Sequence, residues 1–349
     1  MRKFVKATMN DVAREAGVTQ ATVSNVINGT ANVSPELMAK VNNAINKLEY
    51  VPNALAKSLK ENHTYIVGVI MPDIESGHYS VLANYLTDFF REKGYMVFLC
   101  NTNYDTSRER EAIETLIQHN VAGIITTYVL LDSSIYKTII KFKIPVVILD
   151  GRYQNENNDI PSVETDNVLG SELLISYLYD IGMRNICLAS EPLNRTIEIR
   201  LNSYLEAMKK RNMFISNERT YVADHFYNNI DMGYHIGAQI LSGPLPDAVC
   251  ATTDNVAIGI LRKFYESNIR VPDDIIVAGF DNISLCQFIN PSLTSVSQPR
   301  EQLAEHGVDL LLKLINNEKI TERHPLLKPS LIIRASSTRP KINRKSDPL

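Results

Sequence analysis

The cysteine content of this 349-residue chain is low, and the cysteines that it has are scattered. Cys100, Cys187, Cys250 and Cys286 form no CxxC pair, and the first three lie in apolar runs typical of strands. We therefore expect buried, reduced thiols, because disulfide frameworks and structural zinc sites need cysteines at close, repeated spacings. No other metal-ligand spacing occurs, so neither a metal nor a cofactor is expected.

Long hydrophobic runs are also missing. No apolar run approaches the roughly 18–20 residues that a membrane-spanning helix needs. The N-terminal sequence, MRKFVKATMNDV, lacks the apolar core of a signal peptide. These two absences predict a cytoplasmic protein that does not act at a membrane.

Sequence motifs of the common enzyme classes are absent as well. The chain contains no GxGxxG fingerprint, no Walker loop and no GxSxG nucleophile elbow. Serine, histidine and aspartate occur without an arrangement that nominates a nucleophile. We therefore expect no catalytic residues and a protein that is not an enzyme.

What the chain does have is sufficient length and an uneven distribution of charge. Its 349 residues suit a small head followed by two lobes, and its apolar content of 44% allows a sizeable core. Residues 1–62 carry eight Lys and Arg against five Asp and Glu, whereas the remainder carries 28 against 34. A basic head on an acidic body is typical of a phosphate-contacting module attached to a soluble one.

Two short helices joined by a tight turn are predicted near the N-terminus. Thr8 can cap the first helix, and Asp11 occupies the acidic position of a capping box. Gly17 supplies the backbone freedom that a sharp turn needs, and Thr19 can cap the second helix. This pattern predicts a helix-turn-helix, which places the start of the second helix in the DNA major groove.

The second and third helices should each bury one face. Helical spacing places Val23, Val26 and Ile27 on the inward face of the second helix. Another face carries Gln20, Ala21, Ser24 and Asn25. The third helix should begin at Ser34–Pro35 and bury Leu37, Val41, Ile45 and Leu48. The alternative is a three-helix bundle that binds protein or only packs.

Residues 51–63 favour the DNA-binding interpretation. The run from Ala54 to Lys60 is helix-prone but too short to be stable alone in water, so we expect it to become ordered on a partner. We assign residues 1–50 to the head, 51–63 to a hinge helix and linker, and 64–340 to the body.

Four short motifs in this region resemble the head and hinge of the LacI/GalR family of bacterial transcriptional regulators. They are DVAREAGV at 11–18, ATVS at 21–24, NG at 28–29 and PNA at 52–54. The resemblance implies a homodimer that reads a pseudo-palindromic operator and hinge helices that fold in the minor groove, where Leu59 would open a base step. The residues that it assigns to operator DNA are Thr8, Thr19, Gln20, Ala21, Thr22, Ser24, Asn25, Asn28, Asn53, Ala56 and Leu59.

Two residues of the head depart from the family pattern. Asn25 stands where many members carry an arginine, so a different base preference is expected. Glu49 stands where a glycine usually ends the third helix, so a less favourable helix end is expected.

From Tyr65 onward, short apolar runs rich in β-formers alternate with helical stretches. This rhythm predicts βαβ units and parallel sheets covered on both faces. The predicted fold is an all-α head with an α/β body of two doubly wound lobes, resembling the periplasmic binding proteins. We place lobe 1 at about 64–162 and 293–322 and lobe 2 at about 163–290 and 325–340, with a disordered tail at 341–349.

The body also carries landmarks of the same family. They are VETDN at 163–167 with Gly170, RVPDD at 270–274, GFDN at 279–282 and LTSV at 293–296. The resemblance implies that the helix Arg300–Leu314 returns to the first lobe and that Leu331–Arg334 returns to the second.

A polar site is predicted in the cleft between the lobes, where parallel sheets bind ligands at the carboxyl ends of their strands. Asp150 and Asp281 each end a predicted strand, and Arg195 and Arg200 lie early in a helix of the second lobe. Such carboxylates and guanidinium groups can hold the vicinal hydroxyls of a sugar, as sugar-binding members of the family do. The alternative is salt bridging between the lobes without a ligand.

Four further residues complete the predicted effector site. His78 and Tyr79 align with paired aromatic residues that face the effector in relatives, and Tyr79 could stack on an apolar sugar face or belong to the core. Thr253 stands where some sugar-binding members have an asparagine, and Phe226 is assigned to the same site. Asp254 is expected to brace the start of the helix that follows it.

The expected partners are therefore double-stranded operator DNA, a second copy of the chain, and a sugar or sugar phosphate. Two alternatives remain open for the control of the body: a phosphocarrier protein, or a non-sugar effector such as a nucleobase.

Overall fold

The computed structural model of the chain describes residues 7–29, 33–51, 64–127, 138–155, 158–213, 219–223 and 229–338. Its contacts divide it into two units, Met1–Thr64 and Tyr65–Leu349, called the head and the body below. Among the described residues, no helix is long and apolar enough to cross a membrane. The predicted site residues Asn53, Ala56, Leu59 and Phe226 and the predicted tail at 341–349 lie outside the described ranges.

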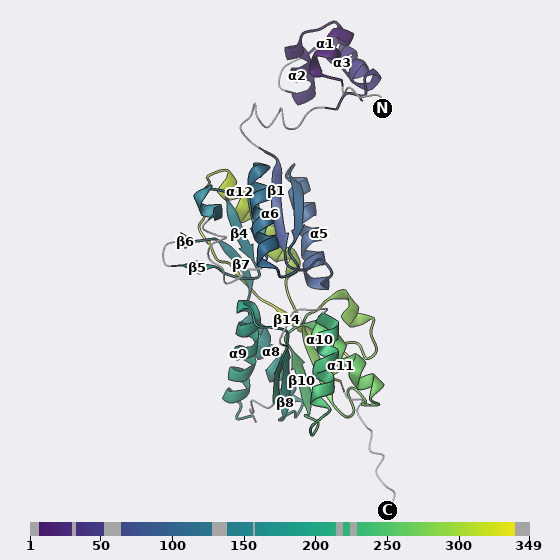
Figure 1. Cartoon of the computed structure of the whole chain (residues 1–349), viewed down its shortest axis with the longest axis vertical. Coiled ribbons are helices and arrows are strands. Elements are labelled where there is room, and N and C mark those ends of the chain that lie inside the picture. The colour runs from purple at the N-terminus through teal and green to yellow at the C-terminus, as the bar shows by residue number, and fades with distance from the viewer. Residues whose placement is uncertain are drawn as a thin grey trace, which may run out of the picture. The chain divides into compact units, whose positions relative to one another are not determined.

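The head consists of helices α1 (Met9–Ala16), α2 (Gln20–Asn28) and α3 (Pro35–Lys47) (Figure 1). The predicted capping box is present, because the Asp11 N–H donates to Thr8 Oγ1 at 3.3 Å and the Thr8 N–H donates to Asp11 Oδ2 at 2.9 Å. Gly17 ends α1 in the left-handed region at φ 67°, and Thr19 caps α2. The helix-turn-helix predicted from these residues is confirmed.

The core of the head differs in one helix from the predicted pattern. Val12, Val23 and Val41 are fully buried, as expected. In α3 the second buried position belongs to Ala44, whereas Leu37, Ile45 and Leu48 are only partly buried. Ala44 follows Val41 by three residues, so both face the same side of the helix, and its small side chain lets α3 approach its neighbours closely.

Glu49 ends α3 in the left-handed region, at φ 47°. The Tyr50 N–H donates to the Ile45 carbonyl at 3.0 Å and the Glu49 N–H donates to that of Asn46 at 3.3 Å. This is a Schellman ending, which places its left-handed residue one position beyond the C-cap Leu48. A residue with a Cβ is strained there, so the predicted unfavourable helix end is confirmed.

The first lobe of the body is a six-stranded sheet of order β13-β7-β4-β3-β1-β2, in which all pairings are parallel. Helices α5 and α12 pack on one face of the sheet and α6 on the other (Figure 1). The elements of this lobe are β1 (Ile66–Met71), α5 (Gly77–Glu92), β2 (Met96–Asn101), α6 (Thr106–Gln118), β3 (Gly123–Thr126), β4 (Val146–Leu149), β7 (Ser162–Thr165), α12 (Arg300–Ile315) and β13 (Leu326–Leu327).

The second lobe is a six-stranded sheet of order β14-β12-β11-β10-β8-β9, in which only the β12–β14 pair is antiparallel. Helices α8 and α9 cover one face, and α10 and α11 cover the other. The elements are α8 (Asn167–Asp180), β8 (Ile186–Ser190), α9 (Arg195–Lys210), β9 (Thr220–Val222), α10 (Asn229–Ile240), β10 (Ala248–Ala251), α11 (Asp254–Glu266), β11 (Ile276–Asp281), the 3-10 helix η2 (Ser284–Gln287), β12 (Thr294–Ser297) and β14 (Ser330–Ile332).

A short antiparallel ribbon, β5 (Gln154–Asn155) with β6 (Asn158–Asp159), connects β4 to β7. The two-lobed fold of doubly wound sheets agrees with the predicted class, apart from the antiparallel edge strand β14. That exception was not visible in the sequence, because a short apolar strand carries no mark of its direction.

Three strands belong to the opposite lobe from the one predicted. β7 and β13 were expected in the second lobe and lie in the first sheet, where Leu149 pairs with Val163 and Glu164 with Leu326. β12 was expected in the first lobe and lies in the second sheet beside β11. Strands this short can pair with either sheet, and only the positions of the chain crossings decide between them. The return of the helix Arg300–Ile315 to the first lobe is as expected.

Candidate functional site

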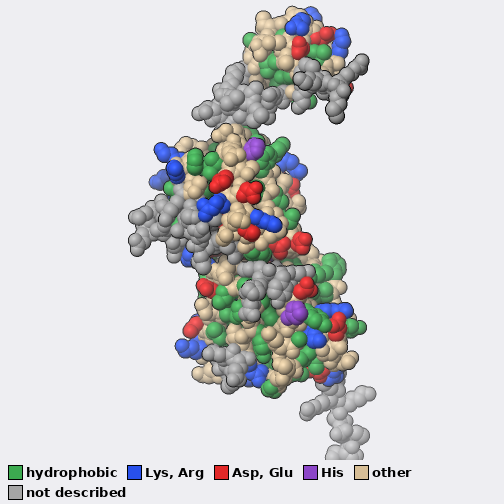
Figure 2. All heavy atoms as spheres, in the orientation of Figure 1, with side chains coloured by type: hydrophobic (Ala, Val, Ile, Leu, Met, Phe, Trp, Pro, Cys, Tyr) green, Lys and Arg blue, Asp and Glu red, His purple; other side chains and the backbone are tan. Residues whose placement is uncertain are grey.

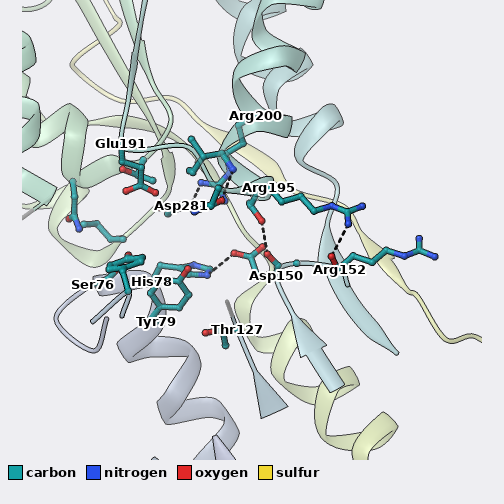
Figure 3. Close-up of a pocket in the computed structure, with 18 residues that line it drawn as sticks. Ser76, His78, Tyr79, Thr127, Asp150, Arg152, Glu191, Arg195, Arg200 and Asp281 are labelled. Atoms are coloured by element: carbon teal, nitrogen blue, oxygen red, sulfur yellow. Dashed lines mark hydrogen bonds and ion pairs between the residues drawn. The ribbon is translucent and has the colours of Figure 1, made fainter. Parts of the chain in front are cut away.

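A polar cavity lies between the two lobes of the body, at the carboxyl ends of their strands (Figure 3). Thr127 and Asp150 follow β3 and β4 of the first sheet. Glu191 and Thr253 follow β8 and β10 of the second sheet, and Asp281 is the last residue of β11. Parallel sheets place their ligand sites at this edge, so the cavity is the candidate site of the body.

Seven of the eight residues assigned to the effector site line this cavity. They are His78, Tyr79, Asp150, Arg195, Arg200, Thr253 and Asp281. The eighth, Phe226, lies outside the described residues. The free volume of the cavity is about 40 Å³, which has room for only a few water molecules. A ligand the size of a sugar therefore needs the lobes or the side chains to move apart.

Arg200 is the most buried cation of the cavity, with 2% of its surface exposed. It reaches the site from α9 and donates from Nε to Asn167 Oδ1 at 2.8 Å and from Nη1 to the Thr252 carbonyl at 2.9 Å. Its guanidinium carbon lies 3.9 Å from the centre of the Phe280 ring. These contacts hold the guanidinium plane in one orientation, as recognition of a polar ligand requires.

Asp281 receives two hydrogen bonds on one carboxylate oxygen. Arg200 Nη1 donates to Oδ1 at 3.0 Å and Gln298 Nε2 donates to the same atom at 2.7 Å. Gln298 is held in turn by Thr165 Oγ1, which donates to its Oε1 at 2.7 Å. The backbone of Asp281 is left-handed at φ 111°, an unfavourable conformation for a residue with a Cβ and one often found at functional sites.

Asp150 occupies the corresponding position of the first lobe, with φ 55°. Its Oδ2 lies 3.2 Å from His78 Nε2, and both side chains are buried. The Tyr79 ring contacts the His78 ring edge-on, with centroids 5.0 Å apart. Thr196 Oγ1 donates to the Asp150 carbonyl at 2.9 Å, so α9 of the second lobe contacts the strand end of the first.

Buried polar atoms without a hydrogen-bond partner gather at this cavity. Among the described residues they include Asp150 Oδ1, Thr253 Oγ1 and Arg152 Nε. Native proteins leave few such atoms, and water or a ligand normally satisfies them. The cavity therefore has the character of a site for a polar molecule.

Two charged residues of this region also make contacts that were not predicted. Arg195 lies beside Arg152 in the cavity lining and donates from Nη1 to its carbonyl at 2.8 Å (Figure 3). Asp254 is the first residue of α11 and lies at the start of that helix, as expected. Its carboxylate accepts from the Ile283 N–H at 2.8 Å and from Ser295 Oγ at 2.6 Å, and so ties α11 to the segments after β11.

Glu191 and Gln298 are among the residues of the cavity region that sequence reasoning missed. Glu191 directly follows β8, so the rule that found Asp150 at the end of its strand could also have found Glu191. Burial, the nearby Asp281 carboxylate and Asp73 raise the pKa of Glu191 to about 8, although Arg200 opposes the shift. Gln298, which contacts Asp281, had no signal in the sequence, because its position depends on where the chain crosses between the lobes.

The candidate nucleic-acid interface of the head is one face of α2. Gln20 and Ala21 are exposed, and Asn28 Nδ2 donates to Ser24 Oγ at 3.2 Å along the same face. Asn25 lies on this face and is partly buried. Residues at this spacing share one side of a helix, so α2 can present them together to a groove.

The threonines assigned to DNA contact lie at helix starts. The Thr22 N–H donates to Thr19 Oγ1 at 3.2 Å, and the two hydroxyls lie 2.9 Å apart. Thr8 Oγ1 donates to Asp11 Oδ2 at 2.6 Å. Exposed hydroxyls and N–H groups at a helix start suit phosphate oxygens. On the face of the body shown in Figure 2, acidic and basic side chains are interspersed.

Known proteins match both parts of the chain. Residues 8–53 match the family model described as bacterial regulatory proteins, lacI family, and residues 175–337 match the periplasmic binding protein-like domain. The ribose operon repressor of Escherichia coli (strain K12) is 34% identical over 334 residues, which cover 95% of this chain and 100% of that protein. The HTH-type transcriptional repressor PurR of Histophilus somni (strain 2336) is 31% identical over 335 residues, covering 95% and 98%.

A solved structure matches over the same extent. The crystal structure of the Lac repressor dimer bound to operator and the anti-inducer ONPF aligns with a TM-score of 0.85 at 26% identity. The alignment covers 96% of this chain and 100% of that chain. The order of head and body is therefore shared along nearly the full length.

Proposed function

Because the chain belongs to the LacI family of bacterial regulatory proteins, and is thus a DNA-binding transcriptional regulator and not an enzyme, we propose that it is a repressor controlled by a sugar-like effector. It binds a pseudo-palindromic operator in the bacterial cytoplasm as a homodimer. The effector occupies the cavity between the lobes. The observation that carries this proposal is the convergence of Arg200, Asp281 and Asp150 with partnerless buried oxygens on one small polar cavity.

The chemistry of the cavity fits a polyhydroxyl ligand. Each sugar hydroxyl can donate one hydrogen bond and accept others. Asp150 Oδ1 is a partnerless acceptor, and Thr253 Oγ1 can both donate and accept. The Arg200–Asp281 pair places a charged donor beside a charged acceptor, which suits two neighbouring hydroxyls. Tyr79 supplies a partly buried ring for the apolar face of a sugar.

The proposed operator reader is the face of α2 that carries Gln20, Ala21 and Asn25. One such helix offers few base contacts, so specific binding needs two half-sites related by a two-fold axis. The hinge helix with Leu59 in the minor groove remains part of the proposal and lies outside the described residues.

Exposed apolar side chains support self-association of the body. Met96 and Leu99 lie on the edge strand β2 and are 63% and 47% exposed. Leu285 and Phe288, at η2 of the second lobe, are 43% and 76% exposed. An open sheet edge with apolar side chains is a common pairing surface. We propose that these two surfaces, one in each lobe, form the dimer contact.

The proposal is tested in two steps with the full chain. First, the preferred operator is selected from random double-stranded DNA. The affinity for that operator is then measured with free sugars, sugar phosphates and nucleobases in the absence of any other protein. A saturable change with a sugar supports the proposal. A change that requires a phosphocarrier protein, or that only a nucleobase produces, would replace it with one of the two alternatives.

A further inference from the structure

Glu191 is a buried acid of the cavity whose carboxyl group has no partner among the residues that the structure describes. It directly follows β8, lines the cavity and is 5% exposed. The hydrogen bond at this residue involves its carbonyl oxygen, which accepts from Ser190 Oγ at 2.8 Å. Among the described residues, none donates to or accepts from its carboxyl group. Figure 3 shows this carboxyl on the second-lobe side of the cavity, facing Ser76 and His78 of the first lobe.

The surroundings of Glu191 favour its uncharged form. A carboxylate loses hydration on burial and needs donors in exchange, which the described residues do not provide. Asp281 and Asp73 add negative charge nearby, and the opposing cation Arg200 is already paired with Asp281. Together these effects raise the pKa of Glu191 to about 8. At neutral pH the carboxyl group therefore carries its proton and has an O–H to donate.

We propose that Glu191 determines the specificity of this cavity by donating a hydrogen bond from its carboxyl group to an acceptor oxygen of an uncharged effector. This inference rests on the proposed function of the cavity as an effector site. The carboxyl group is buried at the cavity, and no described residue forms a hydrogen bond with it. Its role is to recognise an acceptor on the ligand, such as a ring oxygen or a hydroxyl oxygen of a free sugar.

The same arrangement disfavours anionic effectors. Acids of the cavity come from both lobes, Asp150 from the first and Glu191 and Asp281 from the second, and Arg200 is already paired with Asp281. A phosphate placed beside Glu191 would also lie close to the negative charge of Asp281. The titratable and charged groups that line the cavity with Glu191 or act on its charge are Asp73, His78, Tyr79, Tyr104, Asp150, Arg152, Arg195, Arg200 and Asp281.

The test measures the dissociation constant of a free sugar between pH 6 and pH 9. D-ribose is the first probe, followed by other free pentoses and hexoses and the phosphate ester of the sugar that binds. For the parent protein, we expect constant affinity below about pH 7 and a loss approaching tenfold per pH unit above pH 8, because only the protonated form donates. The phosphate ester should bind at least about tenfold more weakly than the free sugar.

Two variants separate hydrogen bonding from packing. Glu191→Gln keeps a neutral donor of similar shape, so its affinity at pH 6.5 should lie within about threefold of the parent's and its pH profile should be flat. Glu191→Met keeps the volume without a donor and should bind about tenfold more weakly at every pH. Glu198→Gln, an exposed acid of α9, is the matched control and should behave like the parent.

The outcomes distinguish this inference from the proposed function. If the parent protein binds no free sugar, the effector part of the proposed function fails and this inference fails with it. If a sugar binds but Glu191→Gln retains the parent's pH profile, or Glu191→Met binds as tightly as the parent, only the role of Glu191 is overturned.

Discussion

Arg300 Nη1 donates to the Asp281 carbonyl at 2.7 Å, and its Nη2 donates to the Asn282 carbonyl at 2.9 Å. Arg300 begins α12, which packs on the first sheet, whereas Asp281 ends β11 of the second sheet. Since the Asp281 side chain faces the effector cavity, the same residue contacts the cavity and the connection between the lobes. A ligand that shifts Asp281 therefore acts directly on the contact between the lobes, which is where a change in lobe orientation has to begin.

The end of α3 gives the first prediction. Replacing Glu49 with glycine should raise the stability of the head by about 0.5–1 kcal/mol, because glycine adopts φ 47° without the strain that a Cβ causes. The measurement is amide hydrogen exchange of the head in the full chain. Glu36→Gly, within the first turn of α3, is the control and should reduce protection. Reduced protection in Glu49→Gly would contradict the geometry of the helix end.

Asn25 gives the second prediction. An asparagine on the recognition helix suits adenine, accepting from N6 and donating to N7, whereas an arginine donates twice to guanine. Each half-site should therefore carry an A·T pair where relatives with arginine take G·C. Asn25→Arg should move the preference to G·C, with a discrimination of about 1–3 kcal/mol per half-site. Binding to operators varied at that one position measures it.

The control for this prediction is Asn25→Ala. If Asn25 is too short to reach a base and contacts only phosphate, the alanine variant will weaken all operators about equally. If the parent protein binds equally tightly to operators with any base pair at that position, Asn25 does not read adenine.

Phe288 gives the third prediction. This side chain is 76% exposed in the described structure, and we place it in the dimer contact. Phe288→Asp should shift the protein from dimer to monomer at micromolar concentration and weaken operator binding, because a buried unpaired charge is unfavourable in an interface. Light scattering measures the mass. Phe142→Asp, at an exposed aromatic residue of the first lobe, should leave the dimer intact. A parent protein that is already monomeric and binds operator fully would contradict the assignment.

The pKa of Glu191 gives the fourth prediction, on stability without ligand. Its pKa lies near the usual acid value in the unfolded chain and at about 8 in the native protein, so between these values the native state binds more protons. Unfolding then releases protons, and the free energy of unfolding falls as pH rises from about 4.5 to about 8, by at most about 1.4 kcal/mol per pH unit.

Glu191→Gln removes this contribution. The variant should gain stability relative to the parent as pH rises through that window, and the difference should become constant above it. Asp254, whose pKa is raised to about 7, chiefly by burial, contributes a slope of the same sign in both proteins and cancels in the comparison. Urea unfolding at several pH values measures the difference in the free energy of unfolding between the two proteins. If the free energy of unfolding changes with pH in the same way in the parent and in Glu191→Gln, Glu191 is ionised in the native state.

Local patterns in the sequence were sufficient for most of the elements. The helix-turn-helix of the head and the alternation of strands and helices from Tyr65 onward were both predicted, because caps, turns and uninterrupted apolar runs are local signals. The placement of β7, β12 and β13 was not accessible in this way. Each is a strand of two to four residues next to a crossing between lobes, and its sheet is chosen by long-range packing.

The residues of the site also divide into those that local patterns identify and those that depend on long-range contacts. Asp150 and Asp281 were found because each ends a strong strand, and parallel strands direct their carboxyl ends to a shared edge. The pairing of Arg200 with Asp281 could not be read from residues 81 positions apart. Gln298 was missed for the same reason, since it reaches Asp281 only through a crossing that the sequence leaves undetermined.

The most direct test of the account is operator binding by the full chain, titrated with a free sugar that the panel identifies, for the parent and for Arg200→Ala and Arg200→Lys. The account predicts a saturable change in operator affinity for the parent and none for either variant, with basal operator affinity close to the parent's. Removal of the Arg200 side chain leaves Asp281 buried without its charge partner and lowers stability by about 3–5 kcal/mol. Arg200→Lys keeps a positive charge beside Asp281, so it is the control for a loss of folding in Arg200→Ala. Loss of basal DNA binding in a folded lysine variant, together with an unchanged response to the sugar, would contradict the account.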